Sequence, residues 1–301
     1  MTRTVICRIC LCFTLALPLH AESPAATGAP GSGHSHRLYL VSGLTGAWMA
    51  GVYAAHIAPW WSGEKSGFRV RYDWFNNVWL EMDKLGHVYG NLWITRATAA
   101  AYRFAGLSGE RALWVGFGVS TGFYTALELT DAGFADWGFS VPDYVANLIG
   151  AGWPLAQHYW APLERVNLKL SYVPSAFYND VRAGERPGFI DYQPYTYPTG
   201  DYDGMTYWLT FRMADLLPEP ARRVWPEWLQ VAAGYGAHNL PQRNAAVKGR
   251  DIYLAVDLDT TRLPGSHPLW RGLLAVLDAV HLPLPGVRFR AGEGPVVGVF
   301  F

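Results

Sequence analysis

The chain has 301 residues, of which 50% are hydrophobic and 16% are charged, and this length is enough for one large domain or two small ones with a buried core. Lysine and arginine together number 24, as do aspartate and glutamate, so no overall charge attracts nucleic acid. Nucleic-acid binding is therefore excluded as a working hypothesis, while the aromatic share of 15% favours contact with a membrane.

The first 21 residues are typical of a secretory signal peptide. Arg3 and Arg8 give a basic start, residues 9–19 are apolar, and Ala21 ends a sequence of the kind that signal peptidase cleaves. The apolar run is shorter than the ~20 residues that a membrane span needs. Residues 22–37 are predicted to form a flexible N-terminus of the mature chain. All cysteines lie in the signal peptide, which predicts a mature chain without disulfides or thiolate metal sites: Cys7, Cys10 and Cys12.

Four apolar segments of helical length predict a membrane-associated bundle over residues 38–165. They are residues 38–61, 83–107, 110–130 and 141–159. The first is either a membrane span or a buried core helix, because it is apolar and ends with Trp60 and Trp61 in the position of an interfacial belt. The fourth has a well-marked start, with Ser140 as the N-cap and Pro142 in the first turn.

Residues 166–301 have a different pattern. Short alternating segments at 167–172, 192–197 and 251–258 predict strands, and amphipathic segments at 205–217, 225–233 and 268–280 predict helices. The predicted fold class is therefore mainly α: a bundle of about four apolar helices with a smaller C-terminal α+β region. We expect an exported, membrane-associated protein of the cell envelope, at the inner membrane or its periplasmic face rather than at the outer membrane.

Polar residues recur at helical spacing within the apolar segments. Asp83, His87 and Asn91 are each four residues apart and lie on one face of the second segment, with Lys84 beside them. Two further polar pairs stand at the end of the third segment and the start of the fourth: Glu128 with Asp131, and Asp143 with Asn147. If consecutive helices are antiparallel, these positions lie at one level of the bundle. The sequence therefore predicts that the polar groups converge.

Ionisable groups in an apolar bundle are costly unless they are paired or functional. We take six of them as candidate catalytic residues: Asp83, Lys84, His87, Glu128, Asp131 and Asp143. Asn91 and Asn147 are candidate binding residues. In an enzyme, His87 would be the general acid or base, oriented by Asp83 or Asp143, and Lys84 would stabilise an anionic group. An ion-pair network that only fixes helix register would use the same residue types, so the alternative stays open.

A metal site built on His87 with carboxylates is chemically possible, but one histidine with oxygen ligands has no diagnostic spacing. No metal and no other cofactor is therefore assigned. The chain also lacks a glycine-rich phosphate loop, an HExxH motif and a GxSxG motif. Nucleotide hydrolysis, zinc proteolysis and the common serine-hydrolase chemistry thus have no support.

Several motifs between residues 68 and 175 resemble an uncharacterised family of predicted periplasmic proteins and lipoproteins, domain of unknown function 2279. They are WFNN at 74–77, DKLGH at 83–87, ELTDAGF at 128–134, WGFS at 137–140, DYVANLIG at 143–150 and KLSY at 169–172. The order of the helical motifs is also similar, more weakly, to that of VanZ-like membrane proteins. Neither resemblance supplies established catalytic residues. This chain lacks a cysteine placed for acylation, so the anchoring of the lipoprotein members does not transfer to it.

Two functions remain open. The first is an envelope protein whose Asp/Lys/His/Glu cluster binds or acts on a membrane lipid or a lipid-linked, amphiphilic envelope molecule. The second is a non-catalytic assembly or scaffold protein in which the cluster is a structural ion-pair network. Whether the protein is an enzyme is not decided by the sequence.

Overall fold

A computed structural model of the chain describes residues 32–54, 58–61, 63–186, 189–190, 193–194, 197–240 and 247–301. The predicted signal peptide at 1–21 lies outside these residues, as do the greater part of the flexible segment predicted at 22–37 and part of the strand predicted at 192–197.

Four long helices stand close to the segments that the sequence predicts. They are α1 (Ser32–Val52), α2 (Met82–Phe104), α3 (Gly109–Asp131) and α4 (Val141–Tyr159). Ser140 caps α4 as expected, because its Oγ accepts a hydrogen bond from the Asp143 amide at 3.2 Å, and Pro142 stands in the first turn. Three shorter helices follow: α5 (Ala176–Ala183), α6 (Glu219–Arg222) and α7 (Pro268–Leu277).

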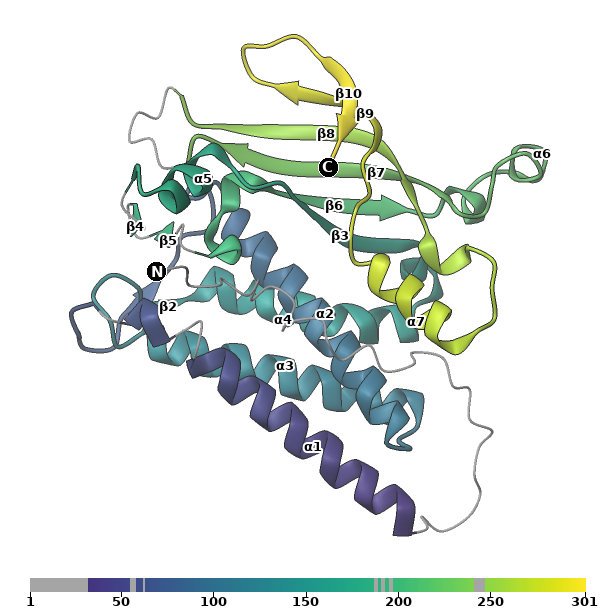
Figure 1. Ribbon diagram of the computed structural model, residues 1–301, viewed down its shortest axis with the longest axis horizontal. Coiled ribbons are helices and arrows are strands. Elements are labelled where there is room, and N and C mark those ends of the chain that lie inside the picture. Colours follow the sequence, from purple (N-terminus) through teal and green to yellow (C-terminus); the bar gives the residue numbers. More distant parts are fainter. Residues whose placement is uncertain are drawn as a thin grey trace.

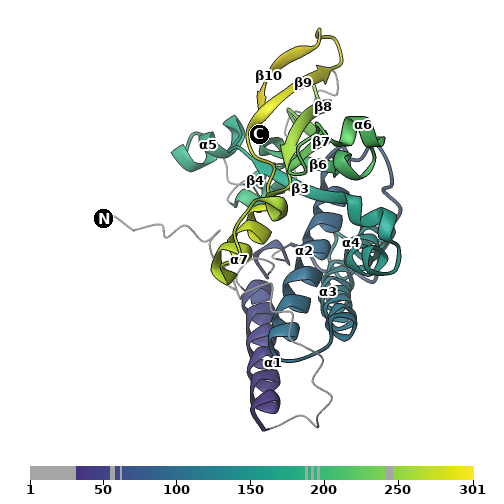
Figure 2. The ribbon, with the colours of Figure 1, turned by 90° about the vertical axis from the view of Figure 1, so that its right-hand side faces the viewer.

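The strands form one large sheet and two small ribbons. The large sheet has six antiparallel strands in the order β10-β9-β8-β7-β6-β3. Its members are β3 (Val166–Tyr172), β6 (Met205–Phe211), β7 (Leu229–His238), β8 (Gly249–Leu258), β9 (Leu284–Arg290) and β10 (Val296–Phe300). The ribbons pair β1 (Val70–Arg71) with β2 (Phe139–Ser140), and β4 (Phe189–Ile190) with β5 (Gln193–Pro194). Figures 1 and 2 show the sheet stacked on one side of α2, α3 and α4.

The predicted fold class, mainly α with a small α+β appendage, is wrong. The six-stranded sheet makes the protein a mixed α and β fold, because two segments predicted as helices, 205–217 and 225–233, instead contain β6 and the start of β7. Buried and partly exposed positions alternate along most of β7. Many of these positions hold alanine or glycine, so the sequence shows no alternation of large apolar and polar residues. Gly234 is required there, since a Cβ at this position would lie 2.6 Å from Cε3 of Trp208.

The membrane span considered at 38–61 is also not supported. Among the described residues, no helix has both the length and the apolar character needed to cross a membrane. The helix in this region, α1, includes His36 and Arg37 and ends at Val52, well before Trp60. It contacts the bundle through Val41, which is buried against α2 and α3, and through a hydrogen bond between Ser42 and Tyr102.

Helix α2 is in contact with both neighbouring helices and with the sheet. Two glycines allow the close approach of the helices. A Cβ at Gly150 of α4 would lie 2.2 Å from the Val88 carbonyl oxygen, and a Cβ at Gly116 of α3 would lie 2.4 Å from the Thr95 carbonyl oxygen. On its other side α2 meets the sheet, where Tyr89 packs beside Tyr207 with ring centroids 6.0 Å apart. The two glycines thus fix the spacing within the bundle.

The sheet is strongly curled, as the contacts of Lys169 show. Two strands lie between β3 and β8, so in a flat sheet the two would be ~14 Å apart, farther than a lysine side chain extends. Yet Lys169 Nζ of β3 lies 2.9 Å from Asp257 Oδ2 of β8 and donates to the Leu258 carbonyl oxygen at 2.6 Å. His281 completes the enclosed layer: it stacks on Trp208 and is fully buried.

Replacing Gly150 with alanine tests the helix spacing. Gly150→Ala is expected to lower the free energy of unfolding by ~1–3 kcal/mol, because the added methyl group collides with the α2 backbone. Gly118→Ala on α3 is the matched control, since nothing lies within 4 Å of its Cβ position, and alanine there should add up to ~1 kcal/mol. Urea denaturation measures both values, and equal effects would contradict this account of the packing.

Candidate functional site

Lys84 stands at the centre of a group of carboxylates. Its Nζ lies 2.8 Å from Asp73 Oδ2, 2.8 Å from Asp83 Oδ2 and 2.8 Å from Asp143 Oδ1. The four side chains are between 6% and 16% exposed, so the group is largely desolvated yet open to solvent on one side. One ammonium thus balances part of the charge of three carboxylates.

Each carboxylate comes from a different local structure. Asp83 and Lys84 are in the first turn of α2, Asp143 is in the first turn of α4, and Asp73 follows β1. The parallel pairing of β1 with β2 brings Asp73 to the start of α4, where Ser140 Oγ donates to Asp73 Oδ1 at 2.9 Å. Asp83 is held in turn by Asn77, whose Nδ2 donates to Asp83 Oδ1 at 3.0 Å.

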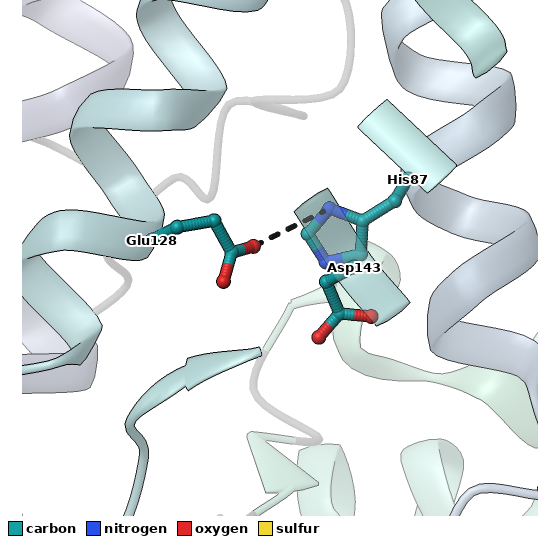
Figure 3. Close-up of side chains that lie close together, drawn as sticks. All are labelled: His87, Glu128 and Asp143. Atoms are coloured by element: carbon teal, nitrogen blue, oxygen red, sulfur yellow. Dashed lines mark ion pairs between the residues drawn. The ribbon is translucent and has the colours of Figure 1, made fainter. Parts of the chain in front are cut away.

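His87 and Glu128 form a second part of the cluster. His87 stands one turn after Asp83 on α2, and Glu128 approaches it from α3. His87 Nδ1 lies 2.8 Å from Asn147 Oδ1 of α4 and 4.0 Å from Glu128 Oε1 of α3. Figure 3 shows the three side chains close together, with Glu128 extending toward the His87 ring and Asp143 lying below the ring in this view. Glu128 is fixed at its second oxygen, because the Ser140 amide donates to Oε2 at 3.1 Å.

A buried amide network supports His87 from behind. Asn91 Nδ2 donates to Asn147 Oδ1 at 2.7 Å, and Ser120 Oγ donates to Asn91 Oδ1 at 2.7 Å. Both asparagines are at most 1% exposed. Because the amide oxygen of Asn147 accepts a hydrogen bond, His87 Nδ1 must carry a proton, which leaves Nε2 of a neutral ring with its lone pair.

The charges shift several pKa values. Burial and the nearby Asp143 carboxylate raise the pKa of Glu128 to about 7, against the opposing effect of His87. Burial disfavours the imidazolium of His87, but Asp143 and Glu128 outweigh it and raise the pKa of His87 above its usual value. Burial opposes ionisation of Asp73 as well, yet the hydrogen bond from Lys84 lowers the pKa of Asp73. A carboxyl group with a pKa near 7, such as that of Glu128, has the range that suits a general acid or base at neutral pH.

The structure brings together all eight residues that the sequence singled out. Seven of them interact directly within the network around Lys84 and His87. Asp131 stands beside it at the end of α3, where Trp61 Nε1 donates to its Oδ1. Burial raises the pKa of Asp131 to about 6. The predicted partner of His87 differs, because Asn147 rather than Asp83 or Asp143 is bonded to its Nδ1.

Sequence reasoning missed Asp73, Asn77 and Ser120. Asp73 and Asn77 lie in a connection without helical period, so spacing gave no signal that they face Lys84. Ser120 stands two turns from Glu128 on the same helix, and this i, i+8 relation was the available signal.

The segment before α2 is held in a strained conformation. Leu80 and Glu81 have φ values of 50° and 64°, which side-chain-bearing residues rarely adopt, at a cost of about 1 kcal/mol or more each. Contacts with the sheet maintain it: Tyr235 Oη donates to the Leu80 carbonyl oxygen at 2.7 Å, and Arg250 pairs with Glu81 at 2.8 Å. The sheet therefore fixes the point at which α2, and with it Lys84, begins.

This site geometry defines a class: a mixed α and β protein with an ion cluster where three helices and a preceding loop meet. Residues 73–157 match the family model described as "Predicted periplasmic lipoprotein (DUF2279)". The match confirms the family resemblance over this range, which contains every residue of the cluster, and it fits an exported, envelope-associated protein. A comparison with curated proteins and one with solved structures gave no match. The weaker similarity to VanZ-like proteins stays a prediction.

Removing the central cation tests the electrostatic account. Lys84→Met is expected to lower the free energy of unfolding by ~3 kcal/mol, because three partly buried carboxylates lose their shared partner. The loss should be smaller at pH 5 than at pH 8, since protonation of the carboxylates removes their repulsion. Lys65→Met, at an exposed lysine, is the control and should change stability by less than ~0.5 kcal/mol. A pH-independent loss would point to lost packing instead.

Proposed function

We propose that this protein binds an amphiphilic envelope molecule, either a membrane lipid or a lipid-linked compound, with the polar head of that molecule at the Lys84–His87 cluster. The observation that carries this proposal is a group of exposed aromatic side chains directly beside the cluster. The segment 68–78, called the aromatic segment below, contains four of them: Phe68, Tyr72, Trp74 and Phe75.

The aromatic segment exposes an unusual amount of apolar surface. Phe75 is 80% exposed, Tyr72 is 70% exposed and Trp74 is 41% exposed. Apolar patches of this kind on a folded chain mark interaction sites. Tyrosine and tryptophan combine an apolar ring with a polar tip, which suits them to the boundary between lipid tails and water.

The polar cluster and the aromatic segment are one continuous structure. Asp73, a partner of Lys84, stands between Tyr72 and Trp74 in the chain. The segment is also anchored, since β1 pairs with β2 and the Phe68 ring stacks on Phe139 with centroids 6.4 Å apart. An amphiphile whose tail contacts the aromatic rings would therefore bring its head group to the exposed side of the cluster.

Binding to vesicles tests this proposal. The mature chain, residues 22–301, is incubated with phosphatidylethanolamine and phosphatidylglycerol vesicles, which are then sedimented. Replacing Trp74 and Phe75 with alanine should reduce the partition coefficient at least about tenfold, because each ring that is withdrawn from water contributes ~1.5–3 kcal/mol. Trp228→Ala is the matched control: Trp228 is 39% exposed and directly precedes β7, and the variant should bind as the unchanged protein does. Figure 1 shows the preceding helix α6 on the opposite side of the molecule from β2. Equal losses in both variants, or no binding by the unchanged protein, would refute the proposal.

A second candidate function is envelope assembly, and one observation favours it. Ile252 and Phe289 are paired across β8 and β9, and together with Leu254 they leave an apolar part of the sheet between 43% and 51% exposed. This candidate predicts that Leu254→Lys abolishes complementation of a deletion strain, scored by detergent sensitivity, while His87→Gln complements fully. The opposite pattern would assign function to the cluster.

A further inference from the structure

Three helices each direct one potential metal ligand to the same place. A ring nitrogen of His87, a carboxylate oxygen of Glu128 and one of Asp143 all lie within 4.8 Å of one another. A tetrahedral ion with ligands at ~2.1 Å needs its ligand atoms about 3.4 Å apart. Rotations of the three side chains, which lie close together in Figure 3, would bring the ligand atoms to this distance.

The charge at this place is strongly unbalanced. Three carboxylates, those of Asp73, Asp83 and Asp143, pair with the single ammonium of Lys84, and a fourth, that of Glu128, lies 4.0 Å from His87 instead. Lys84 forms ion pairs with the first three carboxylates. Among the described residues, His87 is the one basic group in an ion pair with Glu128. Glu128 is 2% exposed, and water cannot screen its charge well. A bound cation would offset this surplus.

Hydrogen bonds hold two of the three ligand residues in place. His87 donates Nδ1–H to Asn147 Oδ1, which directs the lone pair of Nε2 away from the amide network. Metal-binding histidines commonly carry such a hydrogen bond on the ring nitrogen that does not bind the metal. The Ser140 amide likewise holds Glu128 at Oε2, and Glu128 Oε1 lies 4.0 Å from Nδ1 of His87.

A second observation points to a ligand independently of the carboxylates. Asn147 is 1% exposed, and within the described part of the chain its Nδ2 has no hydrogen-bond partner. An unpaired buried N–H donor costs ~1–3 kcal/mol, so it calls for an acceptor. The Oδ1 of the same side chain contacts His87, so this unpaired donor belongs to a residue that touches the ligand set, and a bound water molecule or anion would supply the acceptor.

We propose that His87, Glu128 and Asp143 bind a divalent first-row transition metal ion of the Zn²⁺ or Mn²⁺ class. One imidazole with two carboxylates suits these ions, whereas Mg²⁺ and Ca²⁺ prefer oxygen ligands alone. Three protein ligands leave a coordination position open, which an anionic head group such as a phosphate can take. The metal site stands on ligand geometry and does not require that the protein bind amphiphiles.

Direct binding tests the metal site. The mature chain, residues 22–301, which lacks the three cysteines of the signal peptide, is freed of metal by EDTA and dialysis and titrated with ZnCl₂, MnCl₂ and MgCl₂ by calorimetry. His34 and His36 are replaced by glutamine so that the N-terminal histidines contribute nothing. One equivalent of Zn²⁺ or Mn²⁺ should bind, with Mg²⁺ at least about a hundredfold weaker. Absorption spectra with Co²⁺ report the imidazole and carboxylate ligands separately from affinity.

Isosteric variants decide the assignment. Glu128→Gln and Asp143→Asn should each weaken binding at least about a hundredfold, because a neutral amide replaces an anionic ligand. Asp136→Asn and His158→Gln change an exposed carboxylate and an exposed histidine in the last turn of α4 and should bind as the unchanged protein does. Circular dichroism of the EDTA-treated variants verifies that they are folded. No saturable binding, or binding that Glu128→Gln and Asp143→Asn leave intact, would overturn the metal site, whatever the vesicle experiment shows.

Discussion

The close contact between Gly150 and the Val88 carbonyl oxygen sets the distance between α2 and α4, and the cluster depends on that distance. Asp143 and Asn147 precede Gly150 on α4 by two turns and by one. A wider spacing would remove Asp143 from Lys84 and Asn147 from His87, which are both 2.8 Å contacts. The contacts of Lys84 and His87 with α4 therefore depend on glycine at position 150, where α4 crosses α2.

Two buried lysines show how differently this fold uses similar groups. Lys169 is 0% exposed, and its partners Asp257 and Asp278 enclose it within the curled sheet, where it has a structural role. Lys84 has three carboxylate partners but keeps 12% of its side chain exposed. Only the second arrangement leaves a face that a solute can reach, which is why the candidate site lies at Lys84 rather than at Lys169.

The helices and most of the cluster could be predicted from the sequence, because both follow from the 3.6-residue period. Asp83, His87 and Asn91 share a face for that reason alone. The sheet was underestimated because β7 is rich in alanine and glycine, and those small residues are needed where Trp208 packs on Gly234. Asp73 could not be found in this way, since its position depends on the pairing of β1 with β2, residues that are ~70 positions apart.

The enclosure of Lys169 has a consequence for the order of folding. Helices α2, α3 and α4 follow one another in the chain, so their mutual contacts close short loops, which costs little chain entropy. Lys169 instead donates a hydrogen bond to the Leu258 carbonyl oxygen, 89 residues later in the chain. Its neighbour Asn167 donates to Asp278, 111 residues later. The helical half can thus assemble early, whereas Lys169 of β3 lacks its partners until β8 and the residue after α7 are in place. During that interval an incompletely paired β3 is open to mispairing with other strands.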